Sequence, residues 1–192
     1  MEAHGGLHRW EKLKTISATL RSGGSFFSLH NLPNDPEPRE VTAWLHEERI
    51  CIRPAGAPDR FSHMTANSVM VKSDSGEALL ERKGTPGELH YPLTKDPWGP
   101  LELITFSSYA MWTYLTTPFL MALPGFTVTK IAPWHDANEI WQGIRVEFPP
   151  AILSHSTVQH FYFGEDFLLR RHDYFIDVGG SFYATQYVED MV

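Results

Sequence analysis

From Leu101 to Met121 the chain reads LELITFSSYAMWTYLTTPFLM, and Glu102 is the only charged residue in this stretch. Apolar side chains recur in it at helical spacing, and Pro118 should stop or kink the helix. A helix with almost no polar face must be covered on nearly every side. The stretch therefore predicts a central helix that lies across a sheet or inside its curve.

On both sides of this helix the hydrophobic period changes to two, which is typical of β-strands separated by short turns. The expected strands are 15–20, 25–30, 41–45, 49–53, 61–65, 68–72 and 78–83 before the helix, and 126–131, 140–148, 157–163, 168–178 and 182–188 after it. A short amphipathic helix is expected over 3–13. We find no linker or internal repeat, so the predicted fold is one α+β domain over 1–192, mainly antiparallel β.

The net charge is −7 and the chain contains no basic run, which argues against a nucleic-acid partner, because phosphate binding needs a cationic patch. Aromatic residues make up 13% of the chain. That fraction suits a sheet-rich protein that binds apolar ligands, and it suits an ordinary β-protein core equally well. The single cysteine, Cys51, cannot form an internal disulfide and is expected to be a small buried apolar residue.

The N-terminus has no apolar stretch of signal-peptide length, and no segment is long and apolar enough to span a bilayer. We therefore expect a cytoplasmic protein. No phosphate-binding loop, dinucleotide fingerprint or hydrolase elbow is present, so no cofactor is expected. Exposed sheet edges make a homodimer an open expectation.

The densest group of polar residues is Arg170-Arg171-His172-Asp173-Tyr174. In a strand, Arg170, His172 and Tyr174 share one face, and the two residues between them share the other. His172 and Tyr174 are candidate acid/base or ligand-orienting groups, and Arg170 could hold a carboxylate. The alternative is structural: Arg171 pairs with Asp173 or with an acidic residue on a neighbouring strand, and the other face packs into the core.

A second group is formed by His160 and Tyr162, which share a face of the preceding predicted strand. If that strand pairs with 168–178 in a hairpin, His160 or Tyr162 could approach His172 or Tyr174. Partly exposed strand histidines with ordinary hydrogen bonds are the alternative. No third ligand stands at a diagnostic spacing, so no metal site is expected.

The central helix is crowded with aromatic side chains, of which Tyr109, Trp112, Tyr114 and Phe119 are candidate ligand-binding residues together with Tyr162. For most of these residues, packing in the core between helix and sheet is a sufficient explanation of the aromatic side chain. The functional alternative is that some of them wall an apolar pocket, where a ligand would satisfy their polar tips.

Three motifs carry a resemblance to known proteins. They are HGGLHRW at 4–10, SYAMWTY at 108–114 with Pro118-Phe119, and LLRRHDY at 168–174. With these motifs the chain resembles a set of uncharacterised bacterial proteins whose architecture is similar to the LolA-type lipoprotein carriers. The resemblance implies a strongly curved antiparallel sheet, a half-barrel, with the central helix packed on its concave side over an apolar cavity.

Members of that fold bind lipid chains, and one cytoplasmic member type, in violacein biosynthesis, performs cofactor-free chemistry on an aromatic intermediate. We therefore expect a protein that binds an apolar or aromatic small molecule between the curved sheet and the central helix. The alternative is a cofactor-independent enzyme of isomerase, cyclase or lyase type that uses the same cavity. A cavity completely filled by side chains would instead indicate an interaction module.

Overall fold

The structure of the chain is a computed structural model that describes residues 1–22, 35–94, 97–154, 156–176 and 182–188. The predicted strand 25–30 lies outside the described residues. The helical elements are η1 (Glu2–His4), α1 (Leu7–Trp10), α3 (Pro86–His90), η2 (Tyr91–Thr94), α4 (Pro100–Thr116) and η3 (Phe119–Ala122). None of the described helices is both long enough and apolar enough to cross a membrane.

The strands form two antiparallel sheets. Sheet A consists, in spatial order, of β1 (Thr15–Ser22), β2 (Asp35–Trp44), β3 (Arg49–Arg53), β4 (Arg60–Thr65), β5 (Ser68–Ser73) and β6 (Ala78–Lys83). Sheet B consists of β11 (Phe182–Tyr187), β10 (Leu169–Ile176), β9 (Val158–Phe163), β8 (Glu139–Glu147) and β7 (Thr127–Asp136). The fold is therefore α+β and mainly antiparallel, as predicted, but the described strands do not pair as one continuous sheet.

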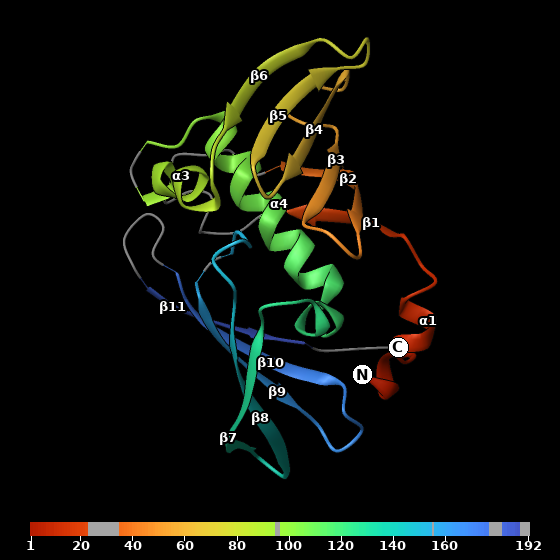
Figure 1. Cartoon of the computed structure of the whole chain (residues 1–192), viewed down its shortest axis with the longest axis vertical. Helices are drawn as coiled ribbons and strands as arrows, with labels where there is room; N and C mark the ends of the chain where they lie inside the picture. Colours follow the sequence, from red (N-terminus) through yellow and green to blue (C-terminus); the bar gives the residue numbers. More distant parts are fainter. Residues whose placement is uncertain (23–34, 95–96, 155, 177–181, 189–192) are drawn as a thin grey trace.

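Helix α4 lies between the two sheets (Figure 1). The chain that joins β6 to β7 carries this helix, so the meander is interrupted at the point where the helix enters the core. Each sheet turns one apolar face inward. The most buried residues on these faces include Val41, Ile50, Met64 and Val69 of sheet A, and Val146, Phe161 and Ile176 of sheet B.

The predicted end of the central helix is confirmed, because α4 ends at Thr116, one residue before the Thr117-Pro118 step. The helix can be buried although it carries several hydroxyl groups. Thr105 Oγ1 donates to the carbonyl oxygen of Leu101 at 2.6 Å, and Thr116 Oγ1 donates to that of Trp112 at 2.7 Å. These bonds satisfy two of the hydroxyls within the helix, whereas Ser108 Oγ and Thr113 Oγ1 are buried without a hydrogen-bond partner among the described residues.

Two polar contacts attach α4 to sheet A. The indole Nε1 of Trp112 donates to the backbone oxygen of Trp44 at 2.8 Å, and Arg82 Nη2 lies 2.7 Å from Glu102 Oε1. Because Trp112 is fully buried, its hydrogen bond fixes the depth at which the helix sits.

The predicted N-terminal helix is shorter than expected. Only α1 is α-helical, and Gly5 and Gly6 separate it from η1 with φ angles of 101° and 81°. Glycine reaches such angles without strain, so the pair acts as a break. Trp10 of α1 stacks on Phe119 with ring centroids 4.4 Å apart, which places Phe119 in a small apolar cluster of its own.

We predict that Trp112→Phe lowers the free energy of unfolding by about 1–3 kcal/mol, because the buried carbonyl of Trp44 loses its donor. Urea denaturation measures the change. Tyr183→Phe is the control, since that ring is 61% exposed and its substitution should leave the stability unaltered. Equal stability of the two variants would contradict the role given to the indole hydrogen bond.

Candidate functional site

His172 lies in the core between sheet B and α4, where it is 3% exposed. Its Nε2 is 2.7 Å from Gln159 Oε1, and because an amide oxygen only accepts, the imidazole donates. The ring stacks on Phe161 at a centroid distance of 4.1 Å. Burial lowers the pKa of His172 to about 3, against smaller raising effects of the Gln186 side chain and Asp173. His172 is therefore neutral at physiological pH.

The hydroxyl groups of Tyr114 and Tyr174 meet beside this histidine, 2.9 Å apart. Gln186 Nε2 donates to the Tyr114 hydroxyl at 2.7 Å, so the phenol is held by two partners. Burial raises the pKa of Tyr114 well above its ordinary value. The structure thus brings together three of the predicted residues: Tyr114 and Tyr174 share a hydrogen bond, and the His172 ring contacts both of their rings.

The register of sheet B separates this cluster from the second predicted group. His172 pairs with Phe161, whereas His160 pairs with Asp173 and Tyr162 pairs with Arg171. His160 and Tyr162 therefore point to the outer face of the sheet. Burial lowers the pKa of His160, while the charge of Asp173 raises it and that of Arg145 lowers it further.

The outer face holds a buried ion pair under aromatic rings. Arg171 Nε donates to both carboxylate oxygens of Asp173, at 2.8 and 3.0 Å, which confirms the structural alternative for these two residues. The guanidinium carbon lies 3.6 Å from the ring centroid of Trp134, and Nη1 donates to the Tyr187 hydroxyl at 2.9 Å. Tyr162 is a further wall of this site, so it does not share a pocket with the aromatic residues of α4.

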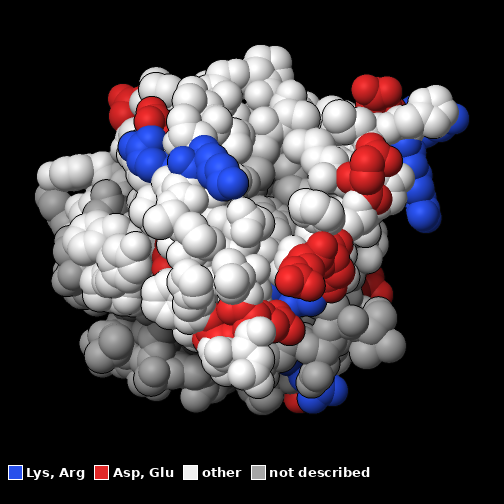
Figure 2. All heavy atoms as spheres, turned by 90° about the horizontal axis from the view of Figure 1, so that it is seen from below, with Lys and Arg blue, Asp and Glu red and all other residues white. Residues whose placement is uncertain are grey.

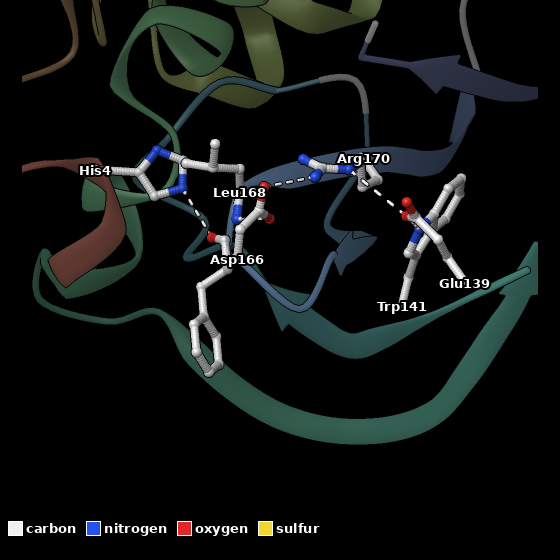
Figure 3. Close-up of polar contacts among 7 residues, drawn as sticks. His4, Glu139, Trp141, Asp166, Leu168 and Arg170 are labelled. Carbon is white, nitrogen blue, oxygen red and sulfur yellow. Dashed lines mark hydrogen bonds and ion pairs between the residues drawn. The ribbon is translucent and has the colours of Figure 1, made fainter.

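Arg170 does not accompany His172 and Tyr174, because it occupies a register shift between Leu169 and Arg171. Figure 3 shows its guanidinium between two acidic side chains. Arg170 Nη2 lies 2.6 Å from Asp166 Oδ2, and Nε lies 4.0 Å from Glu139 Oε2. The arginine does hold carboxylates, but they belong to its own chain.

A cleft of about 650 Å³ opens beside Arg170, and we call it the turn cleft because the β7–β8 and β9–β10 turns form its walls. Asp136, Glu139 and Asp166 line it together with Trp141 and Tyr187. Seen from the end of the molecule that carries sheet B, charged side chains form small separate groups with uncharged surface between them (Figure 2).

A second cleft of about 740 Å³ lies at the other end of sheet B, and we call it the end cleft. His160, Asp173, Tyr174 and Tyr183 line it, and His90 lines it from α3. The remaining wall is mostly apolar: Pro86, Pro150, Ile152, Leu153, Val158 and Phe175. Two predicted residues, His160 and Tyr174, therefore meet here even though they belong to opposite faces of the sheet.

The third cavity lies between sheet A and the first two turns of α4, with a volume of about 350 Å³, and we call it the helix–sheet cavity. Its apolar lining is Ile52, Pro54, Ala55, Val71, Leu80, Pro100, Leu103 and Ile104. Its polar lining is Ser22, Ser62, Ser107, Gly56, Arg39 and Arg60. An apolar pocket of this size with a few polar groups is the usual form of a small-molecule site.

The aromatic residues of α4 and η3 that were predicted to bind a ligand line none of these three cavities. Tyr109 and Trp112 are fully buried, and Phe119 is covered by Trp10. They fill the space along the second half of the helix. The open space lies along the first half, next to Leu103 and Ser107.

The sequence analysis missed the two arginines of the helix–sheet cavity, although a signal was present. Arg39 stands two residues before Val41 and Arg60 stands two residues before Ser62, so strand alternation places each on the side of the sheet that carries the cavity, although the Arg60 side chain is 46% exposed. A charged residue at an inward position is unusual and marks either a pair or a ligand contact.

Glu48 was also missed. It lies in the β2–β3 turn, is 5% exposed, and accepts a hydrogen bond from Leu153 N at 2.9 Å, which joins sheet A to the loop after β8. Its Oε1 is buried without a hydrogen-bond partner among the described residues. Burial raises the pKa of Glu48 to about 8, although the bond from Leu153 lowers it. Only the folded chain reveals this residue, because its partner is 105 positions away.

Within the described ranges, no group of three or more His, Cys, Asp or Glu side chains is arranged to hold a metal ion. The chain matches no protein-family model and no curated protein. The geometry of the cavities is therefore what a functional proposal must rest on.

We predict that the His172 ring does not titrate between about pH 5 and 8, because its pKa lies far below that range. The ring nitrogen chemical shifts, followed by NMR and assigned with His172→Phe, measure this. A titration midpoint in the ordinary range of histidine would show that water reaches the imidazole, and this would contradict the burial of His172 in the core.

We predict that the protein loses stability as the pH rises from about 6.5 to 8, because folded Glu48 keeps a proton that the unfolded chain releases. Below about pH 6.5 the buried, neutral His172 contributes a slope of the opposite sign. The slope is at most about 1.4 kcal/mol per pH unit. Glu48→Gln keeps an acceptor for Leu153 and should flatten the curve, as measured by urea denaturation across this range. Glu47→Gln, at an exposed neighbouring position, is the control and should leave the slope intact.

Proposed function

We propose that this protein binds an apolar small molecule in the helix–sheet cavity. The observation that carries the proposal is the cavity itself, whose floor is the inward face of sheet A and whose roof is the first half of α4. Burial of apolar ligand surface there would supply the main driving force. The serine and arginine side chains would orient the ligand.

The likeness to LolA-type carriers is part of this proposal. What supports it is the position of one central helix against an antiparallel sheet with an apolar cavity between them. The half-barrel form and the concave position of the helix belong to the same proposal. The expected cytoplasmic location and the possible homodimer stay predictions.

A second candidate function is cofactor-independent catalysis in the end cleft. It is favoured by one observation, namely that His160, Asp173 and Tyr174 line the same open cleft. Two facts favour the first proposal: Asp173 is bound by Arg171, and the Tyr174 hydroxyl by Tyr114. Catalysis there would rest on His160. A compound whose binding is lost in His160→Ala but kept in a variant with a blocked helix–sheet cavity would support this second function.

We predict that Leu103→Trp weakens the binding of the neutral apolar dye N-phenylnaphthylamine by at least about tenfold, because the indole fills the cavity. Dye fluorescence in a titration measures the dissociation constant. Leu79→Trp is the matched control: it adds the same atoms on the neighbouring strand β6, and Leu79 does not line the cavity.

The dye should bind the unaltered protein and Leu79→Trp equally well. Dye binding that survives in Leu103→Trp would assign the site elsewhere and overturn the proposal. Absence of binding in all three proteins would overturn it as well. Thermal denaturation of each variant shows whether it is folded.

A further inference from the structure

We infer that the ligand of the helix–sheet cavity carries an uncharged oxygen, in the form of a hydroxyl group, which binds to the hydroxyl groups of Ser62 and Ser107. This inference rests on the proposed function, since it names the chemical class that the same cavity accepts. The ligand is then a neutral apolar molecule with a single hydrogen-bonding group on its body.

Ser62 is the polar member of an otherwise apolar row of sheet A. The row crosses four neighbouring strands through directly paired residues that all line the cavity: Ile52, Ser62, Val71 and Leu80. The Ser62 side chain is fully buried. Its Oγ donates to the backbone oxygen of Ile52 at 3.5 Å, which is far longer than an ordinary bond between a hydroxyl and a carbonyl. A buried hydroxyl with so weak a partner favours a ligand oxygen beside it.

Ser107 lies on the opposite wall, which α4 forms. It follows Leu103 by four residues and Pro100 by seven, so the three side chains lie along one strip of the helix and line the cavity together. The hydroxyls of Thr105 and Thr116 are occupied, because each donates to the carbonyl four residues earlier. The Ser107 hydroxyl makes no such bond within the part of the chain that the structure describes. It therefore has a donor and an acceptor to offer to a ligand.

The charged residues of the lining already have partners. The Arg60 side chain is 46% exposed, and its Nε lies 3.9 Å from Asp59 Oδ1. Arg39 interacts with other residues of the chain. The described lining contains no acidic residue that could pair with a cationic ligand. A charged group that left water for this cavity would lose its hydration without a matching gain, whereas an uncharged oxygen needs one or two hydrogen bonds.

The two serines suit an alcohol better than a ketone. While Ser62 donates to the carbonyl of Ile52, its oxygen can still accept a hydrogen bond, and a hydroxyl of the ligand supplies the proton. Ser107 can donate to that same ligand oxygen. A ketone only accepts, so it would use Ser107 and leave Ser62 with its weak bond. The cavity measures about 350 Å³, so a ligand that fills it contacts both walls.

The test measures, by equilibrium dialysis with the full chain, the binding of four probes with the same apolar body: naphthalene, 2-naphthol, 2-acetylnaphthalene and 2-naphthoate. Ser62→Ala and Ser107→Ala should each raise the dissociation constant of 2-naphthol by about three- to tenfold, because each removes one hydrogen bond. Neither variant should weaken the binding of naphthalene, and the ketone should respond to Ser107→Ala alone. Ser108→Ala is the matched control: this neighbouring serine is buried, does not line the cavity, and should leave all four constants unaltered.

The outcomes separate the two proposals. Binding of naphthalene and 2-naphthol that Leu103→Trp weakens, but that neither serine variant changes, would leave the proposed function standing and overturn the bound hydroxyl. Tighter binding of 2-naphthoate than of 2-naphthol would overturn the uncharged group. Binding that Leu103→Trp does not weaken would place the probes outside the cavity and overturn both proposals, as would absence of binding by all four probes. Thermal denaturation shows whether each variant is folded.

Discussion

The fold depends on one constraint, which is that α4 has no face suited to water. Its side chains are apolar, aromatic or hydroxylic, and Glu102 at the first turn carries its only charge. A helix of this composition is stable only when it is surrounded. Sheet A covers it on one side and sheet B on the other, and the polar tips of Trp112 and Tyr114 bind a carbonyl of one sheet and a hydroxyl of the other. Both sheets are therefore arranged around the requirements of a single helix.

The same helix explains where space is left. Its second half carries Tyr109 and Trp112, whose rings are fully buried between the sheets. Its first half presents Leu103, Ile104 and Ser107 to sheet A, and these smaller side chains do not reach as far. The cavity therefore lies beside the N-terminal half of α4. The location of the candidate site is thus a matter of side-chain volume along one helix.

Local pattern predicted much of this architecture. The apolar stretch and Pro118 were enough to place α4 and its end, and period-two alternation placed β3 and β6 at their observed bounds. The pairing of Arg171 with Asp173 was one of the alternatives that strand geometry offered. Relations between distant segments could not be predicted. The division into two sheets, the register that turns His160 away from His172, and the contact of Glu48 with Leu153 all depend on which strands meet, and one sequence contains no direct record of that. The extra residue at Arg170 shows how small such an error can be, because one bulge removed it from the predicted group.

Dividing the meander into two sheets has a further consequence for association between molecules. One sheet has two edge strands, whereas the described strands have four: β1, β6, β7 and β11. Each edge offers unpaired backbone groups to a neighbouring chain. On β6, Glu81 and Lys83 form an ion pair at 3.0 Å, and β7 contains Lys130 and Pro133, residues that disfavour the docking of another strand. Two sheets therefore present twice as many borders as a single sheet would, and the charges and the proline on β6 and β7 make these two borders poor partners for another strand.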